Sequence, residues 1–256
     1  LLNRSTRKLS ITEAGQAYLD RCRQIVAEVD NLEDAVSNMS EAVRGVLRIN
    51  APMTFGMHHL TPAIAVFQNA HPELQVDLAL DDRVVDIVSE GFDLAIRIAN
   101  LEESSLVARR LAPIRLSVCA SPAYLERRGH PTEPAELVDH ECLGYTYSSA
   151  RDNWRFESDD GVVEVQISGR FRANNGDALR TAALAGHGLI LQPTFIVGDD
   201  LRAGRLIRVM ADYEVAPFSV YAVYAHRQFL SNKVRAFVDY LGSHFGAEPY
   251  WDRDLS

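Results

Sequence analysis

Polar side chains stand at several points where a predicted strand gives way to a helix. Thr54 follows the apolar run 46–51, and Asn174, Asn175 and Thr194 stand at the starts of two helices that each follow a strand. Hydroxyl and amide groups at such positions cap helices, and the free N–H groups beside them suit a carboxylate or a phosphate. Capping alone would explain the same residues, so the pattern indicates a small-molecule site without requiring one.

Two further polar residues belong to the third predicted strand. Arg97 is a charged residue inside the otherwise apolar run 94–98, and Asn100 stands where the chain leaves the sheet. Open α/β sheets bind ligands at the carboxyl ends of their strands, so we expect Arg97 and Asn100 near a ligand. Such a strand occurs in any α/β protein and by itself indicates the fold more than the function.

No arrangement of residues for making or breaking covalent bonds is recognisable. G-x-S-x-G, P-loop, G-x-G-x-x-G, H-E-x-x-H and paired-cysteine motifs are all missing from the sequence. Cys22, Cys119 and Cys142 lack metal-ligand spacing, and the adjacent His58 and His59 cannot face the same way, so we expect both histidines on the surface. We predict no catalytic residue, no metal site and no cofactor. An enzyme with a site assembled from distant residues stays the least favoured alternative.

The composition is that of a soluble globular protein. The chain has 256 residues, of which 47% are hydrophobic and 24% charged. No apolar run approaches the ~20 residues that a bilayer span needs, and the odd cysteine count favours a reducing, cytoplasmic setting. The net charge of −9 argues against nucleic acid binding by most of the chain. Residues 1–8, however, hold Arg4, Arg7 and Lys8 and no acid, which suggests a separate function there.

Residues 10–44 have the pattern of one long helix. Its apolar side chains alternate between spacings of three and four residues, which is the heptad period and lays a narrow apolar stripe along a polar helix. The stripe consists of Cys22, Ile25, Val29, Leu32, Val36, Met39 and Val43. Such a stripe packs on a second copy of the helix in a coiled coil or on the chain's own body. Three heptads favour the coiled coil.

From residue 45 the pattern alternates between strands and helices. Strands at 46–51, 74–80 and 94–98 flank helices at 57–70 and 81–91, a β-α-β-α-β order that is typical of an α/β fold. A second α/β unit follows, with a hairpin around Asp160-Gly161 and two strand-helix pairs. The last predicted elements are a strand at 218–225, a helix from Ser231 to Phe245 and a frayed tail after Gly246.

Taken together, six segments resemble the LysR-type transcriptional regulators, and within them the CrgA-like subgroup. They are LLNRSTRKLSITEAGQAYL at 1–19, GVLRINAP at 45–52, DLAIRI at 93–98, LVARRLAP at 106–113, CASPAYL at 119–125 and AALAGHGLILQP at 182–193. The first and fourth segments are fairly specific, and the others fit many periplasmic-binding-protein-like domains. The resemblance covers Leu1 to about Phe245.

The resemblance implies an α/β fold with a two-lobed effector domain similar to type 2 periplasmic binding proteins. A long α-helical linker for coiled-coil dimerisation and a remnant of a winged helix-turn-helix would precede it. By that pattern residues 1–9 are the remnant of the wing, 10–44 the linker helix, 45–115 and 219–246 lobe I, 116–218 lobe II and 247–256 a tail. The helix-turn-helix itself should precede Leu1, so we expect that this chain alone binds no operator specifically. DNA contacts would come from Arg4, Arg7 and Lys8, and dimer contacts from Ile25, Val29, Leu32, Val36 and Met39.

The family pattern also implies a small ligand in the cleft between the lobes. Thr54 and Phe55 match the ligand-contacting start of the first lobe I helix, Asn174 and Asn175 match the lobe II side, and Arg97 and Asn100 lie near the hinge. We therefore expect a DNA-binding transcriptional regulator that senses a small, anionic metabolite and assembles as a homodimer or homotetramer on promoter DNA. The alternative is an extracytoplasmic solute-binding protein of the same fold.

Overall fold

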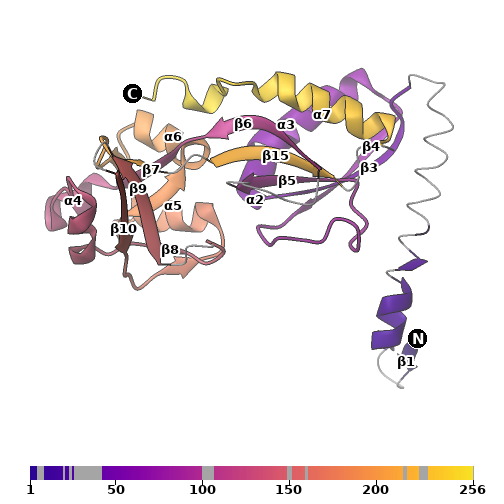
Figure 1. Cartoon of the computed structure of the whole chain (residues 1–256), viewed down its shortest axis with the longest axis horizontal. Coiled ribbons are helices and arrows are strands. Elements are labelled where there is room, and N and C mark those ends of the chain that lie inside the picture. Colours follow the sequence, from indigo (N-terminus) through magenta and orange to yellow (C-terminus); the bar gives the residue numbers. More distant parts are fainter. Residues whose placement is uncertain are drawn as a thin grey trace.

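The computed structural model describes most of the chain. The described residues are 1–4, 9–19, 21–22, 25, 42–99, 107–148, 152–158, 161–215, 218–224 and 230–255. From residue 45 they form two α/β lobes that lie side by side (Figure 1). None of the helices in this part of the chain is long and apolar enough to span a membrane.

The N-terminal residues form a hairpin followed by a helix. Strand β1 (Leu2–Arg4) pairs with β2 (Leu9–Ile11), and the helix starts at residue 13, where Thr12 Oγ1 accepts the Gly15 N–H at 3.0 Å. Of the heptad residues proposed for dimerisation, Ile25 is helical and 50% exposed. The other four lie outside the described residues, as do two of the three predicted DNA contacts: Val29, Leu32, Val36 and Met39, with Arg7 and Lys8.

Lobe I is built on one mixed sheet of five strands in the order β4-β3-β5-β15-β6. β3 runs parallel to β4 and β5, whereas β15 runs antiparallel to β5 and β6. The strands are β3 (Gly45–Ala51), β4 (Leu74–Leu80), β5 (Leu94–Ala99), β6 (Val107–Ile114) and β15 (Phe218–Tyr224). The three predicted parallel strands are thus confirmed, because short apolar runs between turn residues are the pattern of buried strands.

Helices cover one face of this sheet (Figure 1). The predicted helix at 57–70 begins earlier, at Met53, and runs on as one helical stretch. Its parts are α2 (Met53–Phe55), the π-helical turn η2 (Gly56–Leu60) and α3 (Thr61–Ala70). α7 (Asn232–Phe245) packs beside it, and Leu47, Ile49 and Phe237 are fully buried between sheet and helices.

The helix predicted at 81–91 is wrong. This segment consists of turns and bends, in which Val84 is 82% exposed although Ile87 is buried. Asp86 Oδ1 accepts the N–H groups of Val88 at 3.0 Å and Ser89 at 3.1 Å, and such side-chain bonds to the backbone compete with helix formation. The left-handed conformation expected at Gly91 is present, with φ at +74°.

Lobe II contains three small sheets and their covering helices. In the central sheet β7 lies between β12 and β13, and the predicted hairpin pairs β9 with β10, to which β14 adds a third strand. The strands are β7 (Leu116–Ala120), β8 (Gly144–Tyr145), β9 (Asn153–Ser158), β10 (Gly161–Gln166), β11 (Arg172–Ala173), β12 (Ile190–Pro193), β13 (Ile207–Arg208) and β14 (Glu214–Val215). The helices are α4 (Pro122–Arg128), η3 (Pro134–Asp139), α5 (Gly176–Leu184) and α6 (Thr194–Arg202).

The C-terminal segment is ordered, so the prediction of a frayed tail is wrong. It contains the short helix η4 (Tyr250–Asp252), and Trp251 is 3% exposed within the lobe I core. The same segment bonds to lobe II, where Thr194 Oγ1 donates to Asp252 and Arg202 Nη1 donates to the Arg253 carbonyl at 3.0 Å. Residues 249–253 therefore pack against both lobes.

Candidate functional site

Four polar side chains meet where the two lobes face each other. Thr54 of α2 and Asp82, which follows β4, belong to lobe I, whereas Asn175 and Asp177 stand at the start of α5 in lobe II. Thr54 Oγ1 donates to Asp177 Oδ2 at 2.7 Å. Asn175 Nδ2 lies 3.5 Å from Thr54 Oγ1 and 3.4 Å from Asp82 Oδ2. We call these four residues the polar cluster.

Asp82 occupies the helix N-terminus that the sequence suggested for an anion. Thr54 is not the N-cap as predicted, because Pro52 stands at that position and Thr54 lies in the first turn. The Met53 N–H instead donates to Asp82 Oδ1 at 2.8 Å. A carboxylate of the chain itself thus sits at the positive end of this helix. Sequence reasoning missed Asp82, although the pair Asp81-Asp82 directly follows a predicted strand.

Asn175 is the helix cap that the sequence predicted. Its Oδ1 accepts the Ala178 N–H at 3.2 Å, which leaves the Nδ2 group free to face lobe I. The neighbouring Asn174 points its amide toward the Tyr147 hydroxyl at 3.5 Å. Asp177, in the first turn of α5, was not singled out from the sequence, where an acid at that position is ordinary helix chemistry.

The electrostatics of the polar cluster are dominated by its carboxylates. Burial raises the pKa of Asp82, and the negative charges of Asp81 and Asp177 raise it further, while hydrogen bonds from Met53 N–H and Asn175 oppose the shift. Burial also raises the pKa of the Tyr145 hydroxyl, assisted by the charge of Asp82. Tyr145 and Tyr147 pack edge to face with ring centres 6.2 Å apart. The cluster can therefore take up a proton, or it can receive hydrogen-bond donors.

Arg97 lies at the same sheet edge but bonds within lobe I. Its Nη1 donates to Asn50 Oδ1 at 2.6 Å and to the Ile96 carbonyl at 3.1 Å. Burial lowers the pKa of Arg97, an effect that Glu90 and Asp81 oppose. No hydrogen bond joins Arg97 to the polar cluster among the described residues. Asn100 lies outside the described residues.

Phe55 and Thr194 contribute to a different contact between the lobes. Phe55 is fully buried, with its ring centre 5.3 Å from Phe195 of lobe II and 5.7 Å from Trp251. Thr194 is not a cap, since Pro193 holds that position, and its hydroxyl bonds to Asp252. The structure thus brings Thr54 and Asn175 together and places Phe55 and Thr194 elsewhere.

His59 belongs to this second contact, and its predicted surface position is wrong. It is 7% exposed, its Nε2 donates to the Phe195 carbonyl at 3.2 Å, and its Nδ1 lies 2.6 Å from the Tyr250 hydroxyl. Burial lowers its pKa. His58 is exposed as expected. We call the rings of this contact the aromatic cluster: Phe55, His59, Phe195, Phe245, Tyr250 and Trp251.

Comparison with known proteins places this architecture in a family. Residues 40–246 match the model of the LysR substrate binding domain. An HTH-type transcriptional regulator of Haemophilus influenzae is 34% identical over 91% of the chain and 81% of its own length. The regulator CrgA of Neisseria meningitidis serogroup B is 33% identical over 96% of the chain and 82% of its own length.

Solved structures agree with the sequence matches. The structure of CrgA, a LysR-type regulator from Neisseria meningitidis, superposes with a TM-score of 0.71 at 32% identity, covering 95% of this chain and 83% of CrgA. Full-length AphB, a virulence activator of Vibrio cholerae, superposes with a TM-score of 0.72 at 28% identity, covering 94% and 82%. These relatives are transcriptional regulators, and the two-lobed fold is the same. The chain therefore belongs to the LysR-type transcriptional regulators.

Proposed function

We propose that this regulator senses its small-molecule effector at the polar cluster between the lobes. The observation that carries the proposal is the hydrogen bond from Thr54 of lobe I to Asp177 of lobe II at 2.7 Å. A ligand that enters between these residues must replace that bond. Because the bond joins the lobes directly, its replacement alters the contact between them.

The proposed mechanism is a change in lobe angle that passes to the linker helix. The linker region precedes β3, the central strand of the parallel part of the lobe I sheet. An effector shifts such an equilibrium only when it binds the two lobe arrangements unequally. Paired linker helices would carry the change to DNA-binding heads on promoter DNA. The heptad stripe supports a homodimer or homotetramer, and the relatives' names support DNA as the partner.

The charge of the effector depends on which group it replaces. An anionic metabolite, as expected from the helix N-termini, would take the place of the Asp82 carboxylate at the Met53 N–H. Asp82 then gains from taking up a proton, and its raised pKa favours this. An effector with an amino group would instead bind directly to Asp82 and Asp177. An anionic effector would therefore bind more tightly as the pH falls, and an effector with an amino group would bind more tightly as the pH rises.

A ligand screen by thermal shift tests the proposal. Carboxylates, phosphorylated sugars, amino acids and amines would be tested against the unaltered protein and Thr54→Ala. A ligand at 100 times its dissociation constant stabilises by about 2.7 kcal/mol. Thr61→Ala, on the same helical stretch but exposed, is the matched control. A hit that Thr54→Ala weakens and Thr61→Ala spares supports the polar cluster, whereas a hit that neither variant changes places the effector elsewhere.

A further inference from the structure

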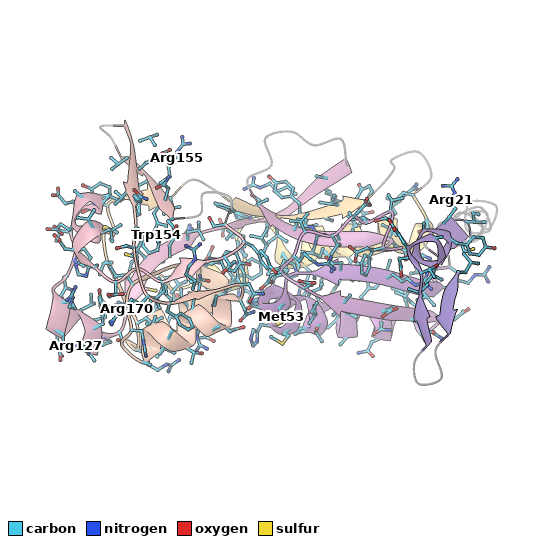
Figure 2. All side chains as sticks on the ribbon, turned by 90° about the horizontal axis from the view of Figure 1, so that it is seen from below. Arg21, Met53, Arg127, Trp154, Arg155 and Arg170 are labelled. Atoms are coloured by element: carbon cyan, nitrogen blue, oxygen red, sulfur yellow. The ribbon has the colours of Figure 1, made fainter. Side chains whose placement is uncertain are left out.

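A separate pocket on lobe II is lined by arginines. It has a volume of ≈ 320 Å³, at the lower end of the roughly 300–1,000 Å³ of small-molecule sites. Its lining residues are Tyr124, Arg127, Arg128, Glu141, Arg170, Ala185, Gly186 and His187. We call it the arginine pocket. Arg127 and Arg170 lie toward the end of lobe II far from Met53, the residue next to the polar cluster (Figure 2). The arginine pocket is thus distinct from the effector cleft.

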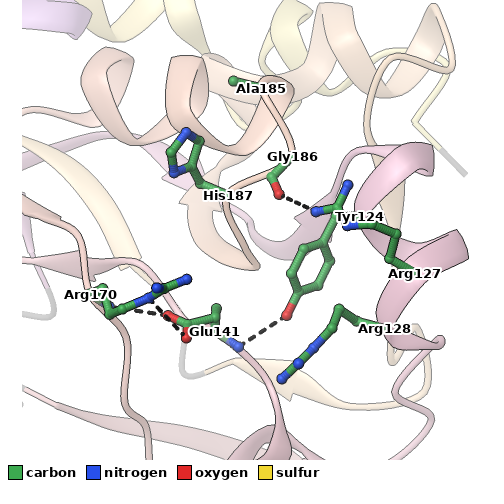
Figure 3. Close-up of a pocket in the computed structure, with 8 residues that line it drawn as sticks. All are labelled: Tyr124, Arg127, Arg128, Glu141, Arg170, Ala185, Gly186 and His187. Carbon is green, nitrogen blue, oxygen red and sulfur yellow. Dashed lines mark hydrogen bonds and ion pairs between the residues drawn. The ribbon is translucent and has the colours of Figure 1, made fainter.

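The pocket is positive on a chain whose net charge is −9. Of its eight described lining residues, three are arginines and one, Glu141, is acidic. Figure 3 shows Arg127 and Arg128 on one side of the hollow and Arg170 with Glu141 on the other. Guanidinium groups keep their charge at any pH compatible with folding. The three arginines and Glu141 together therefore give the pocket a formal charge of about +2.

Backbone carbonyls hold two of the guanidinium groups in place without neutralising them. Arg127 Nη1 donates to the Ala123 carbonyl at 3.1 Å, and Arg127 Nη2 donates to the Gly186 carbonyl at 2.8 Å. Arg128 Nη2 donates to the Asp139 carbonyl at 2.9 Å. Each guanidinium has five N–H groups, so both side chains keep donors for a ligand. Side chains oriented before binding lose less entropy when a ligand arrives.

Glu141 shows which chemistry the pocket accepts. Its carboxylate lies 3.3 Å from Arg170 Nε and accepts the Arg170 N–H at 3.2 Å. The Arg170 side chain is 90% exposed, and exposed ion pairs of this kind contribute only about 0–1 kcal/mol. An incoming dianion can therefore take Arg170 from Glu141 at little cost.

We propose that the arginine pocket is a second ligand site of the regulator, one that binds a phosphoryl group. Three guanidinium groups that approach from two sides suit a tetrahedral dianion, and arginine binds phosphate oxygens with paired, charge-assisted hydrogen bonds. The Tyr124 hydroxyl is already bonded within the lobe, since it accepts the Glu141 N–H at 3.0 Å and lies 3.1 Å from His140 Nδ1, so the arginines are the donors left for a ligand. Binding at this site should not depend on Thr54, which bonds across the lobes to Asp177.

Calorimetric titration with inorganic phosphate at constant ionic strength tests the proposal, with chloride as the reference and malonate as a dicarboxylate comparison. We expect saturable phosphate binding that Arg128→Gln weakens about tenfold, the effect of one lost charge-assisted bond. Glu141→Gln removes the competing carboxylate and should tighten binding several-fold. Arg155→Gln, an exposed arginine on β9 of the same lobe, is the matched control and should change nothing.

Three outcomes would overturn the proposal. The first is no saturable phosphate binding, or binding of malonate in its place. The second is an equal loss in Arg155→Gln and Arg128→Gln, which would mean diffuse attraction of anions to lobe II. The third is a loss in Thr54→Ala, which would place the phosphate in the cleft. Thr54→Ala therefore separates failure of this site from failure of the proposed effector site.

Discussion

Thr54 and Phe55 are neighbours in α2, yet they join lobe I to lobe II in two different ways. Thr54 reaches Asp177 through a hydrogen bond, in a cluster with two carboxylates. Phe55 is fully buried among rings of both lobes and of the C-terminal segment. A hydrogen bond to a charged group contributes about 1.5–3 kcal/mol and can be exchanged for a bond to a ligand, whereas removal of a buried phenyl ring costs about 3–5 kcal/mol.

The difference indicates which contact between the lobes a ligand could exchange. Polar groups that bond to each other can bond equally well to an effector, so the polar cluster is the exchangeable contact. The aromatic cluster is mostly apolar, and its polar bonds, from His59 to Tyr250 and to the Phe195 carbonyl, are buried with it. The bonds of Arg202 to the Trp251 and Arg253 carbonyls also hold the C-terminal segment onto lobe II. We infer that the lobes move about the aromatic side and separate at the polar side.

The largest effect is expected from Phe55→Ala. Removal of a fully buried phenyl ring leaves a cavity and should lower the free energy of unfolding by about 3–5 kcal/mol. Urea unfolding followed by fluorescence measures this. Phe171→Ala removes a ring that is 38% exposed on lobe II and is the control. A loss for Phe55→Ala no greater than that of the control would contradict the aromatic cluster as the permanent contact.

A smaller, pH-dependent effect is expected from His59. Its pKa is lowered by burial, so the unfolded chain binds a proton that the folded chain does not. The stability that this neutral histidine contributes is complete above the unfolded pKa of about 6.5 and is lost as the pH falls below it, by at most about 1.4 kcal/mol per pH unit. Unfolding curves at several pH values measure the slope. His59→Gln should lose this dependence and the exposed His58→Gln should keep it; equal slopes in both variants would refute the assignment.

A double-mutant cycle on Thr54 and Asp177 probes the exchangeable contact. A hydrogen bond to a charged group contributes about 1.5–3 kcal/mol, and partial exposure of Asp177 puts the coupling at the lower end. Thr54→Val, Asp177→Asn and the double variant would be compared by urea unfolding. Coupling near zero would mean that the bond does not hold the lobes together in solution. In that case the effector has nothing to displace there.

Sequence reasoning predicted those parts of the contact between the lobes that depend on the pattern of neighbouring residues. Apolar runs between turn residues marked β3, β4 and β5, and the cap at Asn175 follows from its position before a helix. The same reasoning failed for the turns at 81–93. The helical spacing of Val84 and Val88 does not show whether these side chains face solvent or the core. A valine that faces solvent and a valine that faces a core look alike in one sequence.

The remaining misses come from contacts between distant residues. His59 is buried because rings far along the chain pack on it and Tyr250 bonds to it. Tyr250 and Trp251 are two adjacent aromatic residues in a polar segment without periodicity. Asp82 and Asp177 resembled solvated turn and helix-start acids. Nothing local in the sequence brings Asp177 to Thr54 or Asn175 to Asp82, because these contacts depend on how the two lobes dock.

The smallest effect is expected from Asp82→Asn, which should raise the free energy of unfolding, whereas Phe55→Ala should lower it. A raised pKa means that the folded state holds the Asp82 proton more tightly than the unfolded chain, so stability falls as the pH rises from about 4 through the folded pKa. Asparagine removes the repulsion from Asp81 and Asp177 while its Oδ1 still accepts the Met53 N–H. We therefore expect the free energy of unfolding at neutral pH to rise by no more than about 0.5 kcal/mol. Asp212→Asn, an exposed acid on lobe II, is the control. A clear loss of stability in Asp82→Asn would mean that the negative charge of Asp82 stabilises the helix N-terminus more than the neighbouring carboxylates repel it. An anionic effector would then have to displace a stabilising group.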